Sequence, residues 1–471
     1  MASTRAGLKT EGGLYEAVNR GNKDTFFFDD EPEKTINAFE NRYDRIPPNI
    51  QELRRIPPLN GAEFGRSCEF EFDTAGDIFL RPTVLIDLPS WYPPTEAGLN
   101  PSIGYTEVSS GNAYGYMNGI GYFLFKKIQI FQDKLLLQEI TGDSLFALRA
   151  ARGSLNSAYM ENGLAGWTDG TAASIAAAAT PSRIRLELPF IGERNGFPSI
   201  AMRKQTFKLR LELRPVEQLV ESSDPAATAA PNPWGATFTD RAQPTPHTFR
   251  ALTRTQMASP VLQLETRHTY VDGETQLALR SNTLELPYLR PYENSYIISP
   301  AEYAPIVKGV PAFITRRVDA QHPASRMLWY TRAQNDLRAN RRWKFAADIS
   351  GNEYYSAQSL IIASRDRETL FSPYIWNLLT HHAKEDRDPG FGLGEMSWDL
   401  GDIRGRRAPW NRQPEGTINF TTADRPTIYT SLSAAPNDTL LGAPSTELTV
   451  LVDSWGLYSI ENDRGVLKYG N

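Results

Sequence analysis

The sequence predicts an all-β protein built from large sandwiches. Its dominant hydrophobic period is two, as in residues 68–72 (CEFEF), where every second side chain is apolar. Such alternation is typical of a strand with one buried face. Proline and glycine recur between these runs and supply corners, whereas helical signals are few. At 471 residues the chain is long enough for two large β domains, so we expect two sandwiches.

Two hairpins are predicted in the first half. Residues 78–80 (IFL) resume after the turn at 74–77 as the second arm of a hairpin with residues 68–72, and 84–86 (VLI) extend that arm beyond Pro82. Residues 128–130 (IQI) and 135–137 (LLL) flank the polar turn QDK, which predicts the second hairpin. Further along, Ile184, Leu186 and Leu188 alternate with charged residues and predict another strand.

Residues 194–215 (RNGFPSIAMRKQTFKLRLELRP) change character midway. A run broken by glycine and proline is followed by strict alternation of Phe207, Leu209, Leu211 and Leu213 against Lys208, Arg210, Glu212 and Arg214. We expect a stiff corner and then a half-buried strand whose charged face points to solvent or to a neighbouring subunit. A slip of one residue would exchange the two faces, so the corner fixes the register.

Two short helices interrupt the strands. Asp143 or Ser144 is expected to cap a helix that carries Leu145, Leu148 and Ala151 at three-residue steps. Asp272 is expected to cap another across residues 274–280. The second helix is the natural joint between the sandwiches, because a new series of strands follows from residue 283.

The second half carries the same alternating signal. Ile418 with Phe420, and Leu448 with Val450 and Val452, predict strands near the end of the chain. Residues 171–182 and 222–235 have no apolar periodicity, so both are expected to be long loops from a β scaffold. Repeats of 20–50 residues are not visible, which argues against solenoids and propellers.

Composition excludes several classes of function. The net charge of −5 provides no global basic field, so DNA or RNA is not an expected direct partner. The one cysteine, Cys68, excludes an intramolecular disulfide and a multi-cysteine zinc site, and its parity with Phe70 predicts a buried, unreactive thiol. The first residues, MASTRAGLKTEGG, lack an apolar signal core, and a run of 18 apolar residues that could span a membrane is not found.

Candidate chemical motifs are weak. His381 and His382 open an acidic and basic cluster to residue 388, but adjacent histidines on a helix cannot face one metal ion. Residues 390–394 (GFGLG) lack the flanking strand and helix of a phosphate loop, and a nucleophile elbow is not present. A glycosidase needs only two carboxylates at the right separation, and nothing marks such a pair. Catalytic, metal and cofactor residues are therefore not assigned.

Aromatic residues form 11% of the chain and occur in pairs at 91–92, 329–330 and 354–355. They fit either β-core packing or a large subunit interface, where tyrosine and tryptophan are enriched. From the residues alone, the chain is an all-β protein with long loops and either a structural or a carbohydrate-binding role.

The corner and strand at 194–215 resemble the major capsid proteins of nucleocytoplasmic large DNA viruses, such as those of chlorella viruses and iridoviruses. The matching positions there include Asn195, Gly196, Pro198, Ile200 and Ala201. Other segments follow in the family's order. They are Phe64, Gly65 and Arg66 with Gly76 and Asp77, then 127–145, 268–276 with Asp272, 413–420 with Gln413, Pro414, Gly416, Asn419 and Phe420, and 458–469. The resemblance covers nearly the whole chain.

The chain also departs from the family pattern. The family's basic stretch near the N-terminus is acidic here (residues 29–33, DDEPE), and Ala38 is inserted before Phe39. Residues 131–133 (FQD) replace the Gly-Gly of the family's second hairpin. The sequence is thus similar to a divergent member.

The resemblance implies two tandem eight-stranded jelly rolls, with an N-terminal arm at 1–36, jelly rolls at 37–272 and 283–460, and a tail at 461–471. It implies a homotrimer that forms a pseudo-hexagonal capsomer of an icosahedral shell, with minor capsid, cement and penton proteins as partners and an inner viral membrane nearby. Assembly in the host cytoplasm and residence in the virion follow. It implies an outer loop at 222–235 and no catalytic activity. A carbohydrate-binding protein, a glycosidase and a minor capsid protein are the alternatives.

Overall fold

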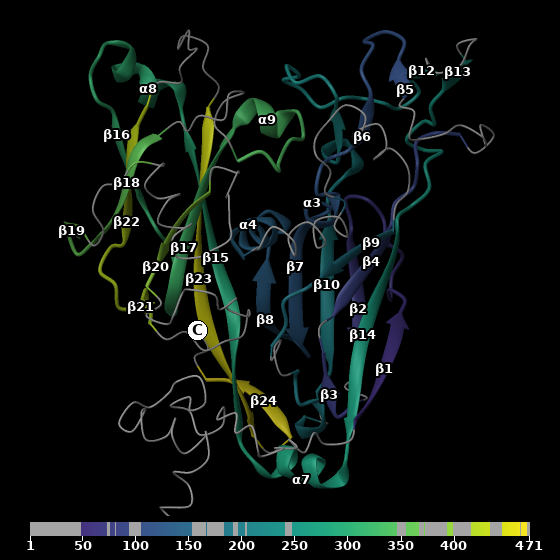
Figure 1. Cartoon of the computed structure of the whole chain (residues 1–471), viewed down its shortest axis with the longest axis vertical. Helices are drawn as coiled ribbons and strands as arrows, with labels where there is room; N and C mark the ends of the chain where they lie inside the picture. The colour runs from purple at the N-terminus through teal and green to yellow at the C-terminus, as the bar shows by residue number, and fades with distance from the viewer. Residues whose placement is uncertain are drawn as a thin grey trace, which may run out of the picture. The chain divides into compact units, whose positions relative to one another are not determined.

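The computed structural model describes residues 49–72, 76–80, 82–93, 105–152, 166, 183–191, 196–202, 205–240, 247–345, 355–366, 372, 393–398, 416–433, 445–461 and 463–468 (Figure 1). The chain from Asn49 onward forms one compact unit. The expectations for residues 171–182 and 381–388 lie outside the described residues, as does that for the N-terminal arm.

The first half of the chain forms one sandwich of two antiparallel sheets. Sheet 1 has the order β1-β14-β4-β9 and sheet 2 the order β2-β10-β7-β8. The strands are β1 (Asn49–Ile56), β2 (Ser67–Phe72), β4 (Thr83–Asp87), β7 (Phe125–Gln132), β8 (Leu135–Ile140), β9 (Arg183–Glu187), β10 (Phe207–Leu213) and β14 (Val261–Val271). The short β3 (Ile78–Phe79) pairs with β14.

The second half forms another sandwich. Sheet 3 has the order β15-β23-β17-β20 and sheet 4 the order β16-β22-β18-β19. The strands are β15 (Leu284–Ile298), β16 (Phe313–Arg317), β17 (Pro323–Ala333), β18 (Tyr355–Ile362), β19 (Arg365–Asp366), β20 (Leu393–Ser397), β22 (Thr427–Leu432) and β23 (Thr446–Glu461). The two-residue β21 (Ile418–Asn419) adds to β17, and β24 (Arg464–Leu467) adds to β23.

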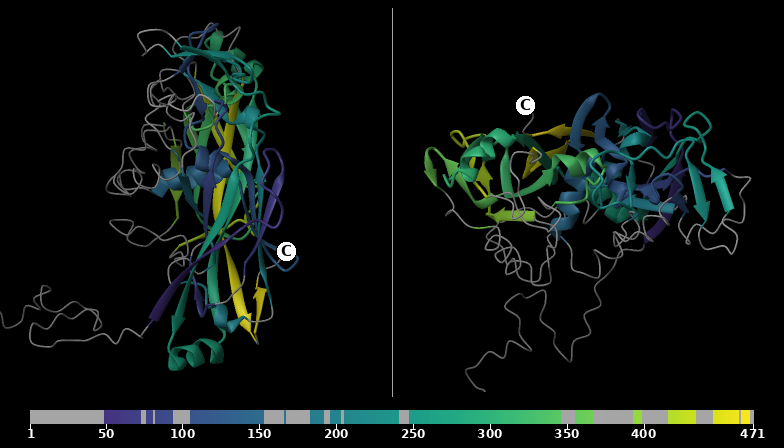
Figure 2. Two further views of the ribbon diagram at one scale, coloured as in Figure 1. Left: turned by 90° about the vertical axis from the view of Figure 1, so that its right-hand side faces the viewer. Right: turned by 90° about the horizontal axis from the view of Figure 1, so that it is seen from above.

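The two sandwiches have the same topology. When the eight principal strands of each half are numbered along the chain, the sheets of both halves read 1-8-3-6 and 2-7-4-5. This order of two four-stranded sheets is that of a jelly roll. The fold is therefore all-β with two tandem jelly rolls, as expected. Helix α7 (Gly273–Ser281) connects β14 to β15 at one end of these long strands (Figures 1 and 2), which confirms the helix predicted after Asp272.

Shorter elements lie between the principal strands. Strands β5 (Tyr105–Glu107), β12 (Thr237–Asp240) and β13 (His247–Arg250) form a small sheet, and β6 (Tyr114–Tyr116) pairs with β11 (Val220–Ser222). The remaining helices are α3 (Ile120–Phe123), α4 (Gly142–Arg152), α8 (Pro300–Val307) and α9 (Gln334–Arg338), with single 3₁₀ turns at Ser199–Ala201 (η3) and Val216–Gln218 (η4). No helix within these described segments is both long and apolar enough to cross a membrane.

Hydrophobic alternation produces the strand pairing of sheet 2. Phe207, Leu209 and Leu211 of β10 are buried, and they lie opposite Phe72, Phe70 and Cys68 of β2. Cys68 is fully buried, which confirms its predicted burial, and burial raises the pKa of its thiol to about 11. The hairpin of β7 and β8 is also confirmed, with Asp133 at a positive φ in the turn.

The other predicted hairpin is wrong. Residues 68–72 form β2 in sheet 2, whereas 78–79 form β3, which pairs with β14 in sheet 1. The chain crosses from one sheet to the other between these strands, because a jelly roll places its second and third strands in opposite sheets. Local alternation reports one buried face but not the partner of the strand.

The central strands of sheet 3, β17 and β23, are buried on both faces. Met327 and Trp329 of β17 pack in the core of the second sandwich, while Leu328 and Tyr330 belong to the core that begins in the first. In the same way Val450 and Val452 of β23 face one core and Leu451 the other. A strand covered on both sides needs a continuous apolar run, which explains why residues 448–452 (LTVLV) are apolar at nearly every position.

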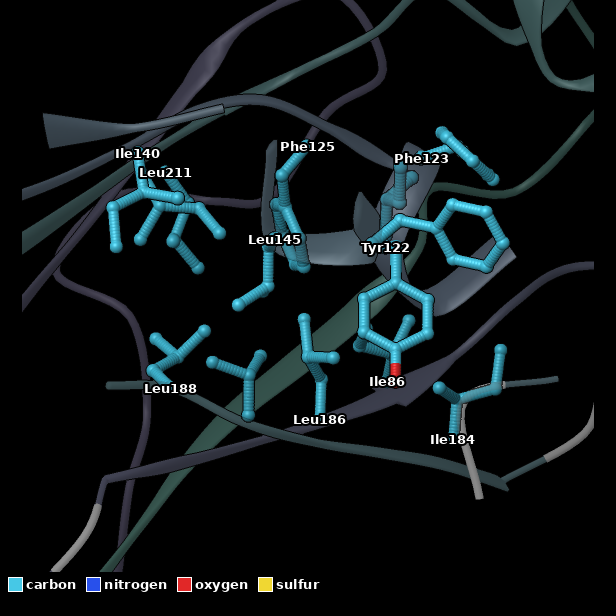
Figure 3. Close-up of a cluster of buried hydrophobic side chains, with 14 of the residues drawn as sticks. Ile86, Tyr122, Phe123, Phe125, Ile140, Leu145, Ile184, Leu186, Leu188 and Leu211 are labelled. Carbon is cyan, nitrogen blue, oxygen red and sulfur yellow. The ribbon is translucent and has the colours of Figure 1, made fainter. Parts of the chain in front are cut away.

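Helix α4 is buried between these layers. Leu145, Phe146, Ala147 and Leu148 are all inaccessible to solvent, and the helix contacts both β7 and β20. Figure 3 shows Leu145 in one cluster with Ile86, Leu186 and Leu211 of the first sandwich. On its other side the ring of Phe146 lies 5.3 Å from that of Phe345, which stacks on Tyr330 at 4.1 Å. The helix thus joins the two sandwiches through apolar contacts.

Candidate functional site

Many of the positions singled out from the sequence meet at one end of the first sandwich, beside α7. The carboxylate of Asp77 accepts hydrogen bonds from the backbone of Val271 (2.8 Å) and the side chain of Gln276 (3.0 Å), which fixes the start of α7 to the β3 corner. The carbonyl of Asp77 accepts from the amide of Ile200 (3.0 Å), and Ser199 Oγ donates to the carbonyl of Gly76 (2.5 Å).

Two glycines permit this close approach. Gly196 has a φ of +80°, and a Cβ there would lie 2.3 Å from Cγ2 of Ile78. A Cβ on Gly76 would lie 2.7 Å from Cβ of His268. Pro198, Ile200 and Ala201 complete the corner and are buried. The corner predicted before β10 is therefore real, and it packs against β3 and the joint helix; Asn195 lies outside the described residues.

Asp272 occupies the N-terminal cap position of α7, but its side chain makes no capping hydrogen bond. The amide of Gln276 instead bonds to the carbonyl of Asp272 (3.0 Å). The predicted position is confirmed and the predicted side-chain role is wrong, because the Asp77 carboxylate, and not that of Asp272, makes the polar contacts that hold this end of the helix.

Phe64, Gly65 and Arg66 form a turn at the far end of β10. The amide of Gly65 donates to the carbonyl of Arg214 (3.2 Å), and Leu213 donates to the carbonyl of Arg66 (3.0 Å). Gly65 has a φ of +78°, Phe64 packs against the core, and the exposed Arg66 pairs with Glu63 (2.7 Å). These residues therefore hold the end of β10 in place.

Asn419 and Phe420 belong to the second sandwich. Asn419 Oδ1 accepts from the amide of Thr421 (3.0 Å), which holds the turn after β21. Phe420 is buried beside Trp398, and its amide donates to the carbonyl of His322 (3.1 Å). Gly416 lies two residues before β21, while Gln413 and Pro414 lie outside the described residues. Within those that are described, no group of three or more histidine, cysteine or acidic side chains is placed to hold a metal ion.

Four of the six paired aromatic residues lie in the core, while Tyr92 is half-buried and Tyr354 lies outside the described residues. Trp91, Trp329, Tyr330 and Tyr355 are buried, and the ring of Trp91 lies 5.1 Å from that of Tyr116. These side chains do not line an open cleft, so the expected core packing is confirmed for them.

A buried ionic network that the sequence analysis missed ties the two sandwiches together. Asp143, in the first turn of α4, accepts hydrogen bonds from Arg214 of the first sandwich and from Arg332 and Arg342 of the second. Arg332 also donates to Glu447 of β23 (2.7 Å) and lies over the ring of Tyr330. Arg214 donates through Nε to the carbonyl of Phe123 (3.0 Å).

Electrostatics make this network strong. Asp143 is 4% exposed and Arg332 is 2% exposed. Burial alone would raise the pKa of the Asp143 carboxyl, but Arg332, Arg214 and Arg342 outweigh burial and hold its pKa well below the usual range. The neighbouring carboxylates likewise raise the pKa of Arg332 despite its burial. Burying these charges costs solvation free energy, which their mutual attraction offsets, so removing one partner leaves the others uncompensated and destabilises the fold.

Two sequence-based expectations are corrected here. Asp143 and Ser144 do not cap α4: Thr141 does, because its Oγ1 accepts from the amide of Ser144 (3.0 Å). Arg214 does not join the exposed charged face of Lys208, Arg210 and Glu212, since it is 6% exposed. The pairing of β10 with β7 shifts register between Glu212 and Leu213, so the alternation that predicted an outward Arg214 ends one residue before it.

Further hydrogen bonds join the two sandwiches. Gln138 of β8 donates to the carbonyl of Leu289 in β15 (2.6 Å), and these edge strands lie beside each other. At β24, the amide of Gly465 donates to Gln205 Oε1 (2.7 Å), and Tyr458 donates to Gln132 Oε1 (2.9 Å). The two jelly rolls are therefore joined by apolar, ionic and polar contacts.

Large apolar side chains remain exposed on both sandwiches. They are Ile50, Leu53, Leu59, Val108, Leu135, Leu136, Val261, Leu277, Ile297, Val310, Phe313 and Val466. Exposed apolar groups are available for association with other molecules. The predicted loop at 222–235 follows β11, and residues 225, 226, 228–230 and 232 within it are exposed.

Comparisons with solved structures identify the same fold in viral capsid proteins. The chain is similar to VP54 of PBCV-1, as fitted into a reconstruction of the virophage Sputnik, with a TM-score of 0.68 and 14% identity over 92% of this chain and 100% of that one. A quasi-atomic model of the PBCV-1 virus capsid gives 0.66 at 13% identity, over 92% of this chain and 100% of that one. The Faustovirus major capsid protein gives 0.58 at 11% identity over 98% of each chain. No protein-family model and no curated protein sequence matches the chain.

Proposed function

We propose that this chain is the major capsid protein of a large DNA virus and that three copies form a pseudo-hexagonal capsomer of an icosahedral shell. The observation that carries the proposal is the repetition of one jelly-roll topology, 1-8-3-6 and 2-7-4-5, in both halves of a single chain. The similarity to the PBCV-1 and Faustovirus capsid structures supports it.

The geometry suits such an assembly. A trimer of chains with two similar sandwiches contains six similar units, which can give a threefold particle a nearly sixfold outline. Closed symmetry repeats equivalent contacts, but it needs a fixed angle between the two sandwiches of each chain. The Asp143 network and helix α4 supply that rigidity. The exposed apolar side chains on both sandwiches are candidates for burial between copies.

The other expected features belong to the same proposal. We assign the first jelly roll to 37–272 and the second to 283–460, with an N-terminal arm before them and a short tail after them. Residues 222–235 form part of the outer surface of the capsomer. Partners are other copies of the chain, minor capsid, cement and penton proteins, and the shell lies near an inner viral membrane. The protein acts by assembly in the host cytoplasm and in the virion, and it is not an enzyme.

The test is the abundance and position of the chain in purified virus particles. Quantitative mass spectrometry should find it as the most abundant structural protein, and antibodies against residues 222–235 should label intact particles. A few copies per particle would indicate a minor capsid protein and contradict the proposal. Binding to a glycan array, or hydrolysis of a glycan, that is lost when one carboxylate is substituted would favour the carbohydrate-active alternative.

A further inference from the structure

Another contact between the sandwiches, separate from the network at Asp143, contains a buried carboxyl group. Residues 340–343 of the second sandwich lie against residues 216–225 of the first. Asn340 donates to the carbonyls of Glu217 (2.7 Å) and Val220 (2.6 Å), and Arg341 donates to the carbonyls of Asp224 and Pro225. Trp343 donates through Nε1 to Glu221 Oε2 (2.9 Å). Of these acceptors, Glu221 alone can change its charge.

The surroundings of Glu221 favour the neutral acid. Its side chain is 1% exposed, and Oε1 has no hydrogen-bond partner among the described residues. Its strand, β11, pairs with β6, where the opposite residue is Gly115. Burial of a carboxylate with an unsatisfied oxygen is unfavourable. The free energy of burying the neutral acid is much lower, and the neutral acid still accepts the hydrogen bond from Trp343.

The nearby charges do not compensate for this burial. Arg341 is the charged group that acts on Glu221, and it is already bonded to two carbonyls and 3.5 Å from Asp336. The other titratable or charged groups on the packed elements have their own partners. These pairs are Glu217 with Arg254, Tyr114 with Glu107, Lys344 with Asp336 and Arg342 with Asp143, while Asp224 accepts from the amide of Ala226.

We propose that this contact is a proton-controlled latch, which holds residues 216–225 against residues 340–343 when Glu221 is protonated and loosens when Glu221 ionises. The latch lies within one chain, so it does not rest on the proposed capsid function. It would make the junction between the sandwiches tighter in mildly acidic solution than at alkaline pH.

The direction follows from linkage. Burial raises the pKa of Glu221 to about 7, although the Trp343 bond, Arg341 and the backbone N–H of Asn118 oppose the rise. A group with a raised native pKa contributes stability that is fully present below its ordinary pKa, near 4.5, and lost as the pH rises through the native value. The latch should therefore open progressively between about pH 5 and pH 8.

The test is hydrogen–deuterium exchange of the full-length protein in its native assembly at pH 5.5, 6.5, 7.5 and 8.5, corrected for the intrinsic exchange rate. In the wild type, exchange is followed in peptides that cover 216–225 and 339–345. The equilibrium constant for local opening of these segments should rise by at least about tenfold across this pH range. In Glu221→Gln it should stay at its low-pH value, because the amide is neutral and its oxygen still accepts from Trp343. Glu217→Gln, an exposed change in the same segment, should behave like the wild type.

Trp343→Phe provides a second readout that does not alter the titrating group. It keeps an aromatic ring but removes the N–H that stabilises the carboxylate, so the midpoint of opening should move to higher pH. A wild-type protein with flat exchange, the same pH dependence in Glu221→Gln, or a midpoint that does not rise in Trp343→Phe would each overturn the latch.

Discussion

Asp143 is the single residue on which the junction between the sandwiches most depends. Three guanidinium groups from both halves of the chain converge on its carboxylate. An isosteric Asp143→Asn substitution removes the charge and leaves these groups undercompensated. The free energy of unfolding should fall by about 3–5 kcal/mol, measured by urea denaturation. Glu139→Gln is the matched control, since Glu139 forms a half-exposed pair with Lys127, and it should cost less than about 1 kcal/mol.

Asp143 gives the free energy of unfolding a pH dependence that is opposite in sign to the one expected from Glu221. The native pKa of Asp143 is lowered, so its contribution is present above its ordinary pKa, near 3.8, and is lost as the pH falls toward the native value. The stability difference between wild type and Asp143→Asn should be constant from pH 5 to pH 8 and should shrink below about pH 4. A difference that grows on acidification would contradict the assigned ion pairs.

Gly196 is a backbone requirement of the corner before β10. Its φ is +80° and a Cβ would meet Ile78 at 2.3 Å, so Gly196→Ala should lower the melting temperature and cost more than about 1 kcal/mol. Gly273→Ala is the control, because that helical glycine has open space around it. The control should be neutral or stabilising by up to about 1 kcal/mol. If Gly196→Ala and Gly273→Ala had equal effects, the added Cβ at residue 196 would cause no strain in the corner, which would contradict this prediction.

At the scale of elements, α4 depends on a cap outside the helix. Thr141 Oγ1 accepts from the amide of Ser144 and its carbonyl accepts from Leu145. Thr141→Ala should destabilise the protein by about 1 kcal/mol, whereas Thr141→Ser keeps the oxygen and should be near neutral. Thermal unfolding of both variants separates the cap from packing of the threonine methyl group, and a similar loss in both would assign the effect to that methyl group.

The sequence predicted those elements whose signal is local. The burial of Phe207, Leu209 and Leu211 follows from period two, and the helix after Asp272 follows from a polar cap before an apolar pattern. The β3 assignment failed because the partner of a strand is a long-range property, which alternation does not encode. Arg214 failed for another reason: β10 ends at Leu213 beside a register shift, so the alternation no longer applies to Arg214, which is buried like Leu213.

The candidate site was less predictable than the strands. Gly76 and Asp77 are far in sequence from Gly196 and from Asp272, and only the resemblance to a family placed them in one set; the structure brings them together around α7. The Asp143 network could not be found from single residues, because its arginines lie on β17 and on loops that meet α4 only in the folded chain. The continuous apolar run at 448–452 was a usable signal that sheet 3 is covered on both faces.

At the scale of the whole molecule, the proposed assembly needs the two sandwiches of each chain, which share one topology, to keep a constant angle. Contacts between copies can repeat around a symmetry axis only if each copy presents the same pair of surfaces. The apolar, ionic and polar contacts at the junction provide that constancy. An obligate interface commonly buries about 2,000–5,000 Å², so the proposed trimer should be more stable to unfolding than the separate chain.

Electron cryomicroscopy of the purified full-length protein, with light scattering for its mass, tests the central claim most directly. The account predicts a particle of three times the 52.8 kDa chain mass, with threefold symmetry and six sandwiches around the axis. A stable monomer, or an assembly in which the two sandwiches of a chain adopt variable angles, would contradict it.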